Sequence, residues 1–149
     1  MRFPHFPLGL LALVSSALHA KPTPPLLDYL RLIRCVKEIE NAAITYVSPS
    51  GARGVYQIKQ RTWEHYSTKP HEWASTFDRI CQIENQRVAL AFAHDIVEKY
   101  IPALGLPVTP YSFCLLYGPG YDRISKMNLT DANVDFAQRF AALYQDPTW

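Results

Sequence analysis

Two glutamates, Glu38 and Glu40, lie near the end of the first predicted helix and are the first candidates for acid–base chemistry. Side chains three, four and seven positions apart share one face of an α-helix. Glu38 therefore lies over Arg34 and Arg31 on a charged face, where a weak surface ion pair is its expected role. The helical phase separates Glu38 from the apolar side of the same helix.

Glu40 lies over Val36 and Ile33 on that apolar side, at the last position of the predicted helix. Partial burial disfavours the charged form of a carboxyl group and raises its pKa, which suits a proton donor. The negative end of the helix dipole acts in the same direction. A glutamate at a helix end is more often simply solvated, so an acid role for Glu40 depends on the residues around it.

The segment that follows Glu40 has an unusual composition: residues 47–58 read Val-Ser-Pro-Ser-Gly-Ala-Arg-Gly-Val-Tyr-Gln-Ile. This segment closely resembles the first two motifs of soluble lytic transglycosylases and goose-type lysozymes. In that family a glutamate ends a helix, and a Ser-Pro-x-Gly-Ala-x-Gly-[LVA]-[MY]-Gln-[IF] segment follows it. A polar residue, a threonine and often a tryptophan come next, and Gln60, Thr62 and Trp63 stand at those positions.

A second stretch of similarity lies downstream, where residues 110–120 resemble the Ala-Tyr-Asn-Ala-Gly helix end that is the family's third motif. Residues 135–140 stand where the family places a tyrosine on its last helix. The resemblance extends over roughly residues 30 to 143. It implies a mainly α, lysozyme-like single domain over residues 21–149, in which helices surround a saccharide cleft and β-structure is scarce or absent.

The resemblance implies Glu40 as the catalytic acid and a set of substrate-binding residues: Ser48, Gly54, Tyr56, Gln57, Tyr117 and Phe136. Gly54 lets the backbone turn sharply and approach a sugar. Tyr56 offers a ring and a hydroxyl, and Gln57 an amide for the carboxyl of Glu40 or for an N-acetyl group. The alternative for both is a half-buried turn. Tyr117 either hydrogen-bonds Glu40, as the family implies, or fills the core.

The implied activity is cleavage of the bond between N-acetylmuramic acid and N-acetylglucosamine in peptidoglycan, with formation of 1,6-anhydro-muramic ends and without metal or cofactor. Glycosidases typically use two carboxyls, and no second acid here has a motif around it. The alternatives are a lysozyme-type hydrolase and a catalytically weakened peptidoglycan-binding domain. Three departures from the family pattern support the last: a stretch from Glu40 to Ser48 that is one residue short, Gly118 in place of asparagine, and Phe136 in place of tyrosine.

The remaining ionisable residues show no comparable pattern. Four acids within predicted helices are expected on solvated faces or in ion pairs: Asp28, Asp78, Glu84 and Asp95. The histidines have neither metal-ligand spacing nor a serine or cysteine partner set. The 3 cysteines are spaced unlike a zinc site, and we expect small buried hydrophobes, with one disulfide as the alternative.

The N-terminal residues 1–20 are typical of a signal peptide: Arg2 precedes an uncharged apolar stretch, and small residues precede a cleavage site ahead of Lys21. An uncleaved membrane anchor is the alternative. The protein is thus expected to be periplasmic or secreted, with no membrane span after cleavage. A net charge of only +2 argues against nucleic acid as a partner.

The helices that would position these residues follow from periodicity, capping residues and prolines. We predict helices over Leu26–Glu40, Ile58–Tyr66, Thr76–Leu104, Pro110 to Gly118 and Asp131–Tyr144. Residues 41–58 are predicted to form a loop with short extended pieces, and His71–Thr76 a connection. Thr130 or Asp131 is the expected N-cap of the last helix.

Overall fold

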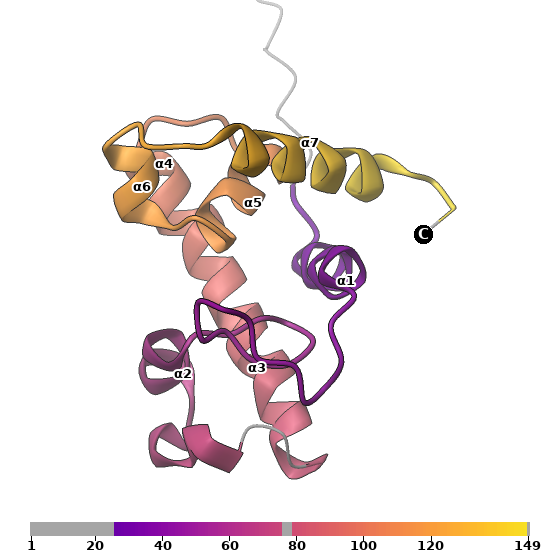
Figure 1. The fold of residues 1–149 in the computed structure, drawn as a ribbon. Coiled ribbons are helices and arrows are strands. Elements are labelled where there is room, and N and C mark those ends of the chain that lie inside the picture. Colours follow the sequence, from indigo (N-terminus) through magenta and orange to yellow (C-terminus); the bar gives the residue numbers. More distant parts are fainter. Residues whose placement is uncertain (1–25, 76–78, 149) are drawn as a thin grey trace, which may run out of the picture.

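The computed structural model describes residues 26–75 and 79–148, which are mainly helical, as predicted (Figure 1). The elements are α1 (Tyr29–Glu40), α2 (Gln60–Tyr66), the 3-10 segment η1 (Pro70–Ser75), α3 (Arg79–Asp95), the π-helical segment η2 (Ile96–Tyr100), α4 (Ile101–Ala103), α5 (Pro110–Tyr117), α6 (Tyr121–Ser125) and α7 (Asp131–Gln145). The expected signal peptide and cleavage site lie outside the described residues. None of the helices in the described ranges combines the length and apolar composition that a bilayer crossing requires.

Helix α1 owes its limits to two capping residues. The carboxylate of Asp28 accepts a hydrogen bond from the Arg31 backbone N–H at 3.1 Å, so the helix begins at Tyr29 and not at Leu26. Asn41 has a left-handed φ of 43°, and its N–H donates to the Lys37 carbonyl at 3.2 Å. This left-handed cap makes Glu40 the final helical residue.

The predicted long helix over Thr76–Leu104 is interrupted in its second half. It consists of α3, the π-helical η2 and the short α4, which follow one another without a loop. Helix α3 packs against α1 and α2, whereas η2 and α4 pack against α5. The π-helical segment therefore lies where the helical run exchanges one set of partners for another, a change that the hydrophobic periodicity did not indicate.

The upper part of the molecule in Figure 1 is organised by α5 and α7. These helices pack together, with the rings of Phe113 and Phe140 5.6 Å apart in the core. A reciprocal capping box between Thr130 and Asn133 begins α7, as predicted for Thr130. Helix α6 and the 3-10 segment were not predicted, because both are too short to produce a hydrophobic period.

All three cysteines lie among the described residues, and each is buried in the core without forming a disulfide. This agrees with the expectation of small buried hydrophobes. Burial, followed by the nearby charge of Glu40, raises the pKa of the Cys114 thiol to about 12. At neutral pH this side chain is a thiol and acts as part of the packing between α5 and its neighbours.

Candidate functional site

The carboxyl group of Glu40 is half-buried at the end of α1, and burial raises its pKa above the usual value for glutamate. It makes no hydrogen bond or ion pair with another described residue. Glu38, two positions earlier, is exposed to solvent. Its expected ion pair with Arg34 or Arg31 is not found among the described residues, and the Arg31 guanidinium donates to the carbonyls of Tyr144 and Asp146 at 2.8 and 2.6 Å.

Residues 47–58 form a compact loop beside Glu40. The Ser48 hydroxyl accepts a hydrogen bond from the Ala52 N–H at 3.1 Å, and the Ser48 N–H donates to the Ala52 carbonyl at 2.9 Å. Isolated β-bridges join Arg53 to Val47 and to Ile58. The expected short extended pieces are these bridges. The loop is therefore held by its own backbone and by the Ser48 side chain.

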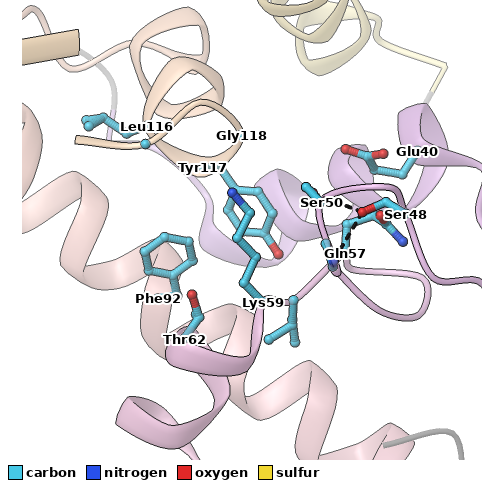
Figure 2. Close-up of a pocket in the computed structure, with 13 residues that line it drawn as sticks. Glu40, Ser48, Ser50, Gln57, Lys59, Thr62, Phe92, Leu116, Tyr117 and Gly118 are labelled. Carbon is cyan, nitrogen blue, oxygen red and sulfur yellow. Dashed lines mark hydrogen bonds between the residues drawn. The ribbon is translucent and has the colours of Figure 1, made fainter. Parts of the chain in front are cut away.

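A cavity of about 290 Å³ lies between this loop and α5 (Figure 2). Its lining comes from four separate parts of the chain: Glu40, Ser48, Ser50, Ala52, Gln57, Ile58, Lys59, Thr62, Phe92, Leu116, Tyr117, Gly118 and Gly120. Figure 2 shows Glu40 and Ser48 on one side, with Phe92 and Leu116 on the opposite side. The fold thus brings Glu40, Ser48, Gln57 and Tyr117 of the predicted set together, despite the short stretch between Glu40 and Ser48.

Tyr117 does not hydrogen-bond Glu40. Its hydroxyl donates to the backbone carbonyl of Tyr56 at 2.8 Å. Burial, together with the charge of Glu40, raises the pKa of Tyr117, so its hydroxyl is protonated at neutral pH. The Tyr117 hydrogen bond therefore joins the loop of residues 47–58 to α5, and these two segments lie on either side of the cavity.

Two other predicted residues, Tyr56 and Gly54, do not line this cavity. Tyr56 lines a separate cavity, together with Lys37, Ile44 and Ile83. Gly54 is buried with a φ of 69°, and a Cβ there would lie 3.5 Å from the Ile44 carbonyl oxygen. Its glycine requirement comes from this turn, because Gly54 does not line the Glu40 cavity.

Gln57 also has an unusual backbone conformation, with a φ of 48°. Its amide N–H donates to the Gly54 carbonyl at 2.8 Å, which orients the amide oxygen within the cavity wall. A left-handed φ at a non-glycine residue carries strain, and such strain is concentrated at functional sites. Trp63 is fully buried and its indole N–H donates to the Lys69 carbonyl at 2.9 Å, so it is a packing residue.

Two further cavities share lining residues with the first, and we call the three together the groove. One, of about 570 Å³, shares Lys59 and Phe92 with the Glu40 cavity and is rich in rings: His65, Tyr66, Tyr100 and Tyr121. The other, of about 390 Å³, shares Glu40 and Lys59 and extends to Phe136. The predicted residue Phe136 therefore lies at one end of the groove, with the Arg139 guanidinium 5.5 Å from its ring centroid.

The groove contains residues that the sequence did not single out, chiefly Lys59, Phe92 and Arg123. Lys59 directly follows the Tyr56-Gln57-Ile58 motif, and that adjacency was the one available signal. Phe92 and Arg123 lie on α3 and α6, and only the packing of these helices brings them to the groove. Neither a family model, nor a curated protein, nor a solved structure matches the chain with significance.

Proposed function

We propose that this protein is an exported, lysozyme-like lytic transglycosylase that cleaves the glycan strands of peptidoglycan, with Glu40 as its only catalytic acid. The proposal is carried by one observation: Glu40, half-buried and without a partner among the described residues, faces a groove together with Ser48 and Gln57 of the family-like motif. A carboxyl in this setting holds a proton at a pH where an exposed glutamate has lost it. That property is required of a general acid.

In the proposed reaction, Glu40 donates its proton to the glycosidic oxygen between N-acetylmuramic acid and N-acetylglucosamine. The bond from the muramic C1 to that oxygen breaks, and the substrate's own N-acetyl oxygen stabilises the cationic C1. Glu40, now a carboxylate, accepts the proton of the muramic 6-hydroxyl as that oxygen bonds to C1. The 1,6-anhydro ring closes without consuming water, and the acid is regenerated.

The distribution of carboxyls supports a one-acid reaction. In the described part of the chain, Glu40 is the only acid that lines the cavity of about 290 Å³. Asp122 lines only the neighbouring cavity of about 570 Å³. Hydrolytic glycosidases place a second carboxyl on the opposite side of the scissile bond, within about 5–10 Å of the first. The cavity that Glu40 lines has no second carboxyl among its described lining residues.

The test is mass spectrometry of purified peptidoglycan digested with the full-length chain after export and with two variants. We expect anhydro-muropeptides from the parent protein and a loss of at least about a thousandfold in Glu40→Gln, since an amide cannot donate the required proton. Glu38→Gln is the matched control: it removes an exposed carboxyl from the same helix end and should leave the rate unchanged. Equal activity in Glu40→Gln would overturn the assignment.

The same digest separates the alternatives. Muramic ends that carry a free reducing group indicate a lysozyme-type hydrolase. Retention on insoluble peptidoglycan without cleavage at any pH indicates a binding domain, for which Gly118 and Phe136 would be the responsible departures. Either result replaces the lyase assignment while keeping the glycan as ligand.

A further inference from the structure

The end of the groove between Glu40 and Phe136 contains two cationic side chains. Its cavity of about 390 Å³ is lined by Glu40, Ser50, Lys59, Gly118, Pro119, Arg123, Ala132, Asn133 and Phe136. Lys59 precedes α2, and Arg123 belongs to α6, so two separate parts of the chain bring a cation to this cavity. In Figure 2 the Lys59 side chain extends from the start of α2 toward Tyr117.

Neither cation is engaged by the protein. Among the described residues, the Lys59 ammonium and the Arg123 guanidinium have no ion pair and donate no hydrogen bond. Four other described cations have such contacts: Lys69 with Glu72 at 3.4 Å, Arg87 with Glu84 at 2.8 Å, Lys99 with Asp95 at 2.9 Å and Arg139 with Asp135 at 3.0 Å. Lys126 has none in the described part of the chain, but unlike Lys59 and Arg123 it does not line the cavity. Lys59 and Arg123 therefore retain their full donor capacity for a ligand in the groove.

The one acid in this cavity does not offset the two cations while it is protonated. Burial raises the pKa of Glu40, and two cations against one acid leave the cavity with a net positive charge even when Glu40 is ionised. A neutral sugar has no need of two cations, whereas a carboxylate accepts charge-assisted hydrogen bonds from both. The cavity is therefore suited to an anionic ligand group beside the proton donor.

We propose that Lys59 and Arg123 form a subsite for a carboxylate on the muramic acid residue of the glycan. This inference rests on the proposed function, because it names the substituent that the same groove recognises. Muramic acid differs from N-acetylglucosamine by a lactyl ether that ends in a carboxyl group. That group is a free carboxylate in peptide-free strands, and in peptide-bearing strands it is an amide followed by the carboxylates of the stem peptide.

The test is a calorimetric titration of the full chain carrying Glu40→Gln, so that the ligand is not consumed. Three tetrasaccharides of alternating N-acetylglucosamine and N-acetylmuramic acid serve as probes: peptide-free, peptide-free with its lactyl carboxyls methylamidated, and peptide-bearing. We expect the free carboxylate to bind about tenfold more tightly than the methylamide at low salt. The difference should shrink as the ionic strength increases.

Lys59→Met and Arg123→Met, added singly to this background, should each reduce that tenfold preference by about threefold, and the double variant should bind both peptide-free probes alike. Lys126→Met, an exposed cation beside α6 that lines none of the groove cavities, is the matched control and should change nothing. Circular dichroism verifies that each variant is folded. Tighter binding of the peptide-bearing probe, lost in the same variants, would identify the stem peptide as the source of the carboxylate.

The outcomes separate the two proposals. Equal affinity for the carboxylate and methylamide probes, or affinities unaffected by Lys59→Met and Arg123→Met, overturns the subsite while the parent protein still cleaves peptidoglycan. Carboxylate-dependent binding through these residues, in a parent that does not cleave, supports the subsite and overturns the lyase assignment. Binding of none of the three probes overturns the subsite, and it overturns the lyase assignment as well where the parent releases no muropeptides.

Discussion

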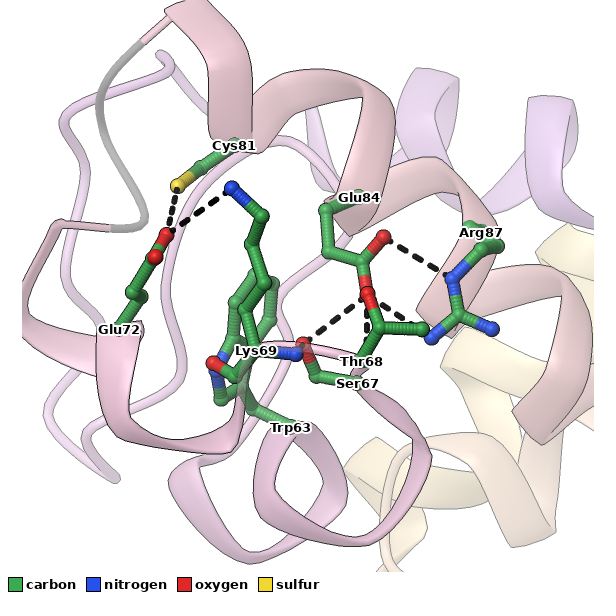
Figure 3. Close-up of polar contacts among 8 residues, drawn as sticks. All are labelled: Trp63, Ser67, Thr68, Lys69, Glu72, Cys81, Glu84 and Arg87. Carbon is green, nitrogen blue, oxygen red and sulfur yellow. Dashed lines mark hydrogen bonds and ion pairs between the residues drawn. The ribbon is translucent and has the colours of Figure 1, made fainter.

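Glu40 and Glu84 are the same residue type in opposite surroundings. Glu84, on α3, accepts hydrogen bonds from the Thr68 backbone and from the hydroxyls of Ser67 and Thr68 at 2.7–3.0 Å, and it forms an ion pair with Arg87 at 2.8 Å (Figure 3). The Arg87 hydrogen bond, with smaller contributions from the Thr68 backbone and the two hydroxyls, lowers the pKa of Glu84 to about 2. Glu40 has none of these contacts, and burial raises its pKa.

The two settings have different consequences for the stability of the folded chain and for proton transfer. Glu84 is ionised at every physiological pH and joins the turn after α2 to α3, so its charge stabilises the folded chain. Glu40 is desolvated without compensation, which is unfavourable for its ionised form. An uncompensated carboxyl that faces a groove is the one able to exchange a proton with a ligand.

The largest expected effect is on the pH dependence of cleavage. Because Glu40 must be protonated to donate, kcat/KM should fall about tenfold for each pH unit above the raised pKa of this carboxyl. Initial rates of muropeptide release over a pH series measure this fall. Glu84→Gln should keep the same profile, since Glu84 does not reach the groove. A rate that increases with pH over the same range would contradict the acid role of Glu40.

A smaller effect is expected on the free energy of unfolding, to which Glu84 contributes more than Glu40. Glu84→Gln should lower the free energy of unfolding by about 2 kcal/mol at neutral pH, because hydrogen bonds to a charged acceptor are lost. The pKa of Glu84 in the folded state, about 2, lies below its usual value of 4.5. Its contribution is therefore fully present above pH 4.5 and disappears as the pH falls through about 2.

Urea denaturation of the parent and of Glu84→Gln across this pH range measures the difference directly. Glu40→Gln should follow the opposite pattern and lose no stability at neutral pH, because the raised pKa of Glu40 makes its ionised form unfavourable in the folded state. A loss of similar size in Glu40→Gln would show that Glu40 has a stabilising partner after all.

The smallest effect concerns the hydrogen bond from Tyr117 to the Tyr56 carbonyl. Tyr117→Phe removes one donor and should cost about 1 kcal/mol of unfolding free energy. The rate of cleavage should also drop several-fold, because this bond positions the backbone next to Gln57. Tyr111→Phe on the same helix is the control, since the Tyr111 hydroxyl has no hydrogen bond among the described residues. Equal losses in both variants would exclude a positioning role for Tyr117.

Much of the helical framework could be predicted, because it depends on local signals. Helix α1 and the half-buried position of Glu40 follow from apolar residues at three- and four-residue steps. Helix α7 begins with a capping box between Thr130 and Asn133, which are only three positions apart. The predicted start of α1 at Leu26 was wrong by three residues, because the helix begins at Tyr29. The Asp28 side chain caps the helix there.

The lining of the groove depends on packing between distant segments, which periodicity does not contain. Arg123 reaches the groove because the short helix α6 follows α5 closely, and no pattern predicted that helix. Tyr56 lines a separate cavity and not the Glu40 cavity, although the motif placed it beside Gln57.

The π-helical segment Ile96–Tyr100 has a consequence for changes in chain length. A π-turn holds one residue more than an α-turn, so deleting one residue here would convert it into an α-turn and leave the direction of α4 relative to α3 nearly unchanged. An α-helix turns by about 100° per residue, so the same deletion within α3 would rotate the later elements by about that angle. Tyr117 and Phe136 would then leave the side of the molecule on which α1 holds Glu40. Deletion of one residue should therefore be tolerated in this segment, as in exposed loops, and not within α3.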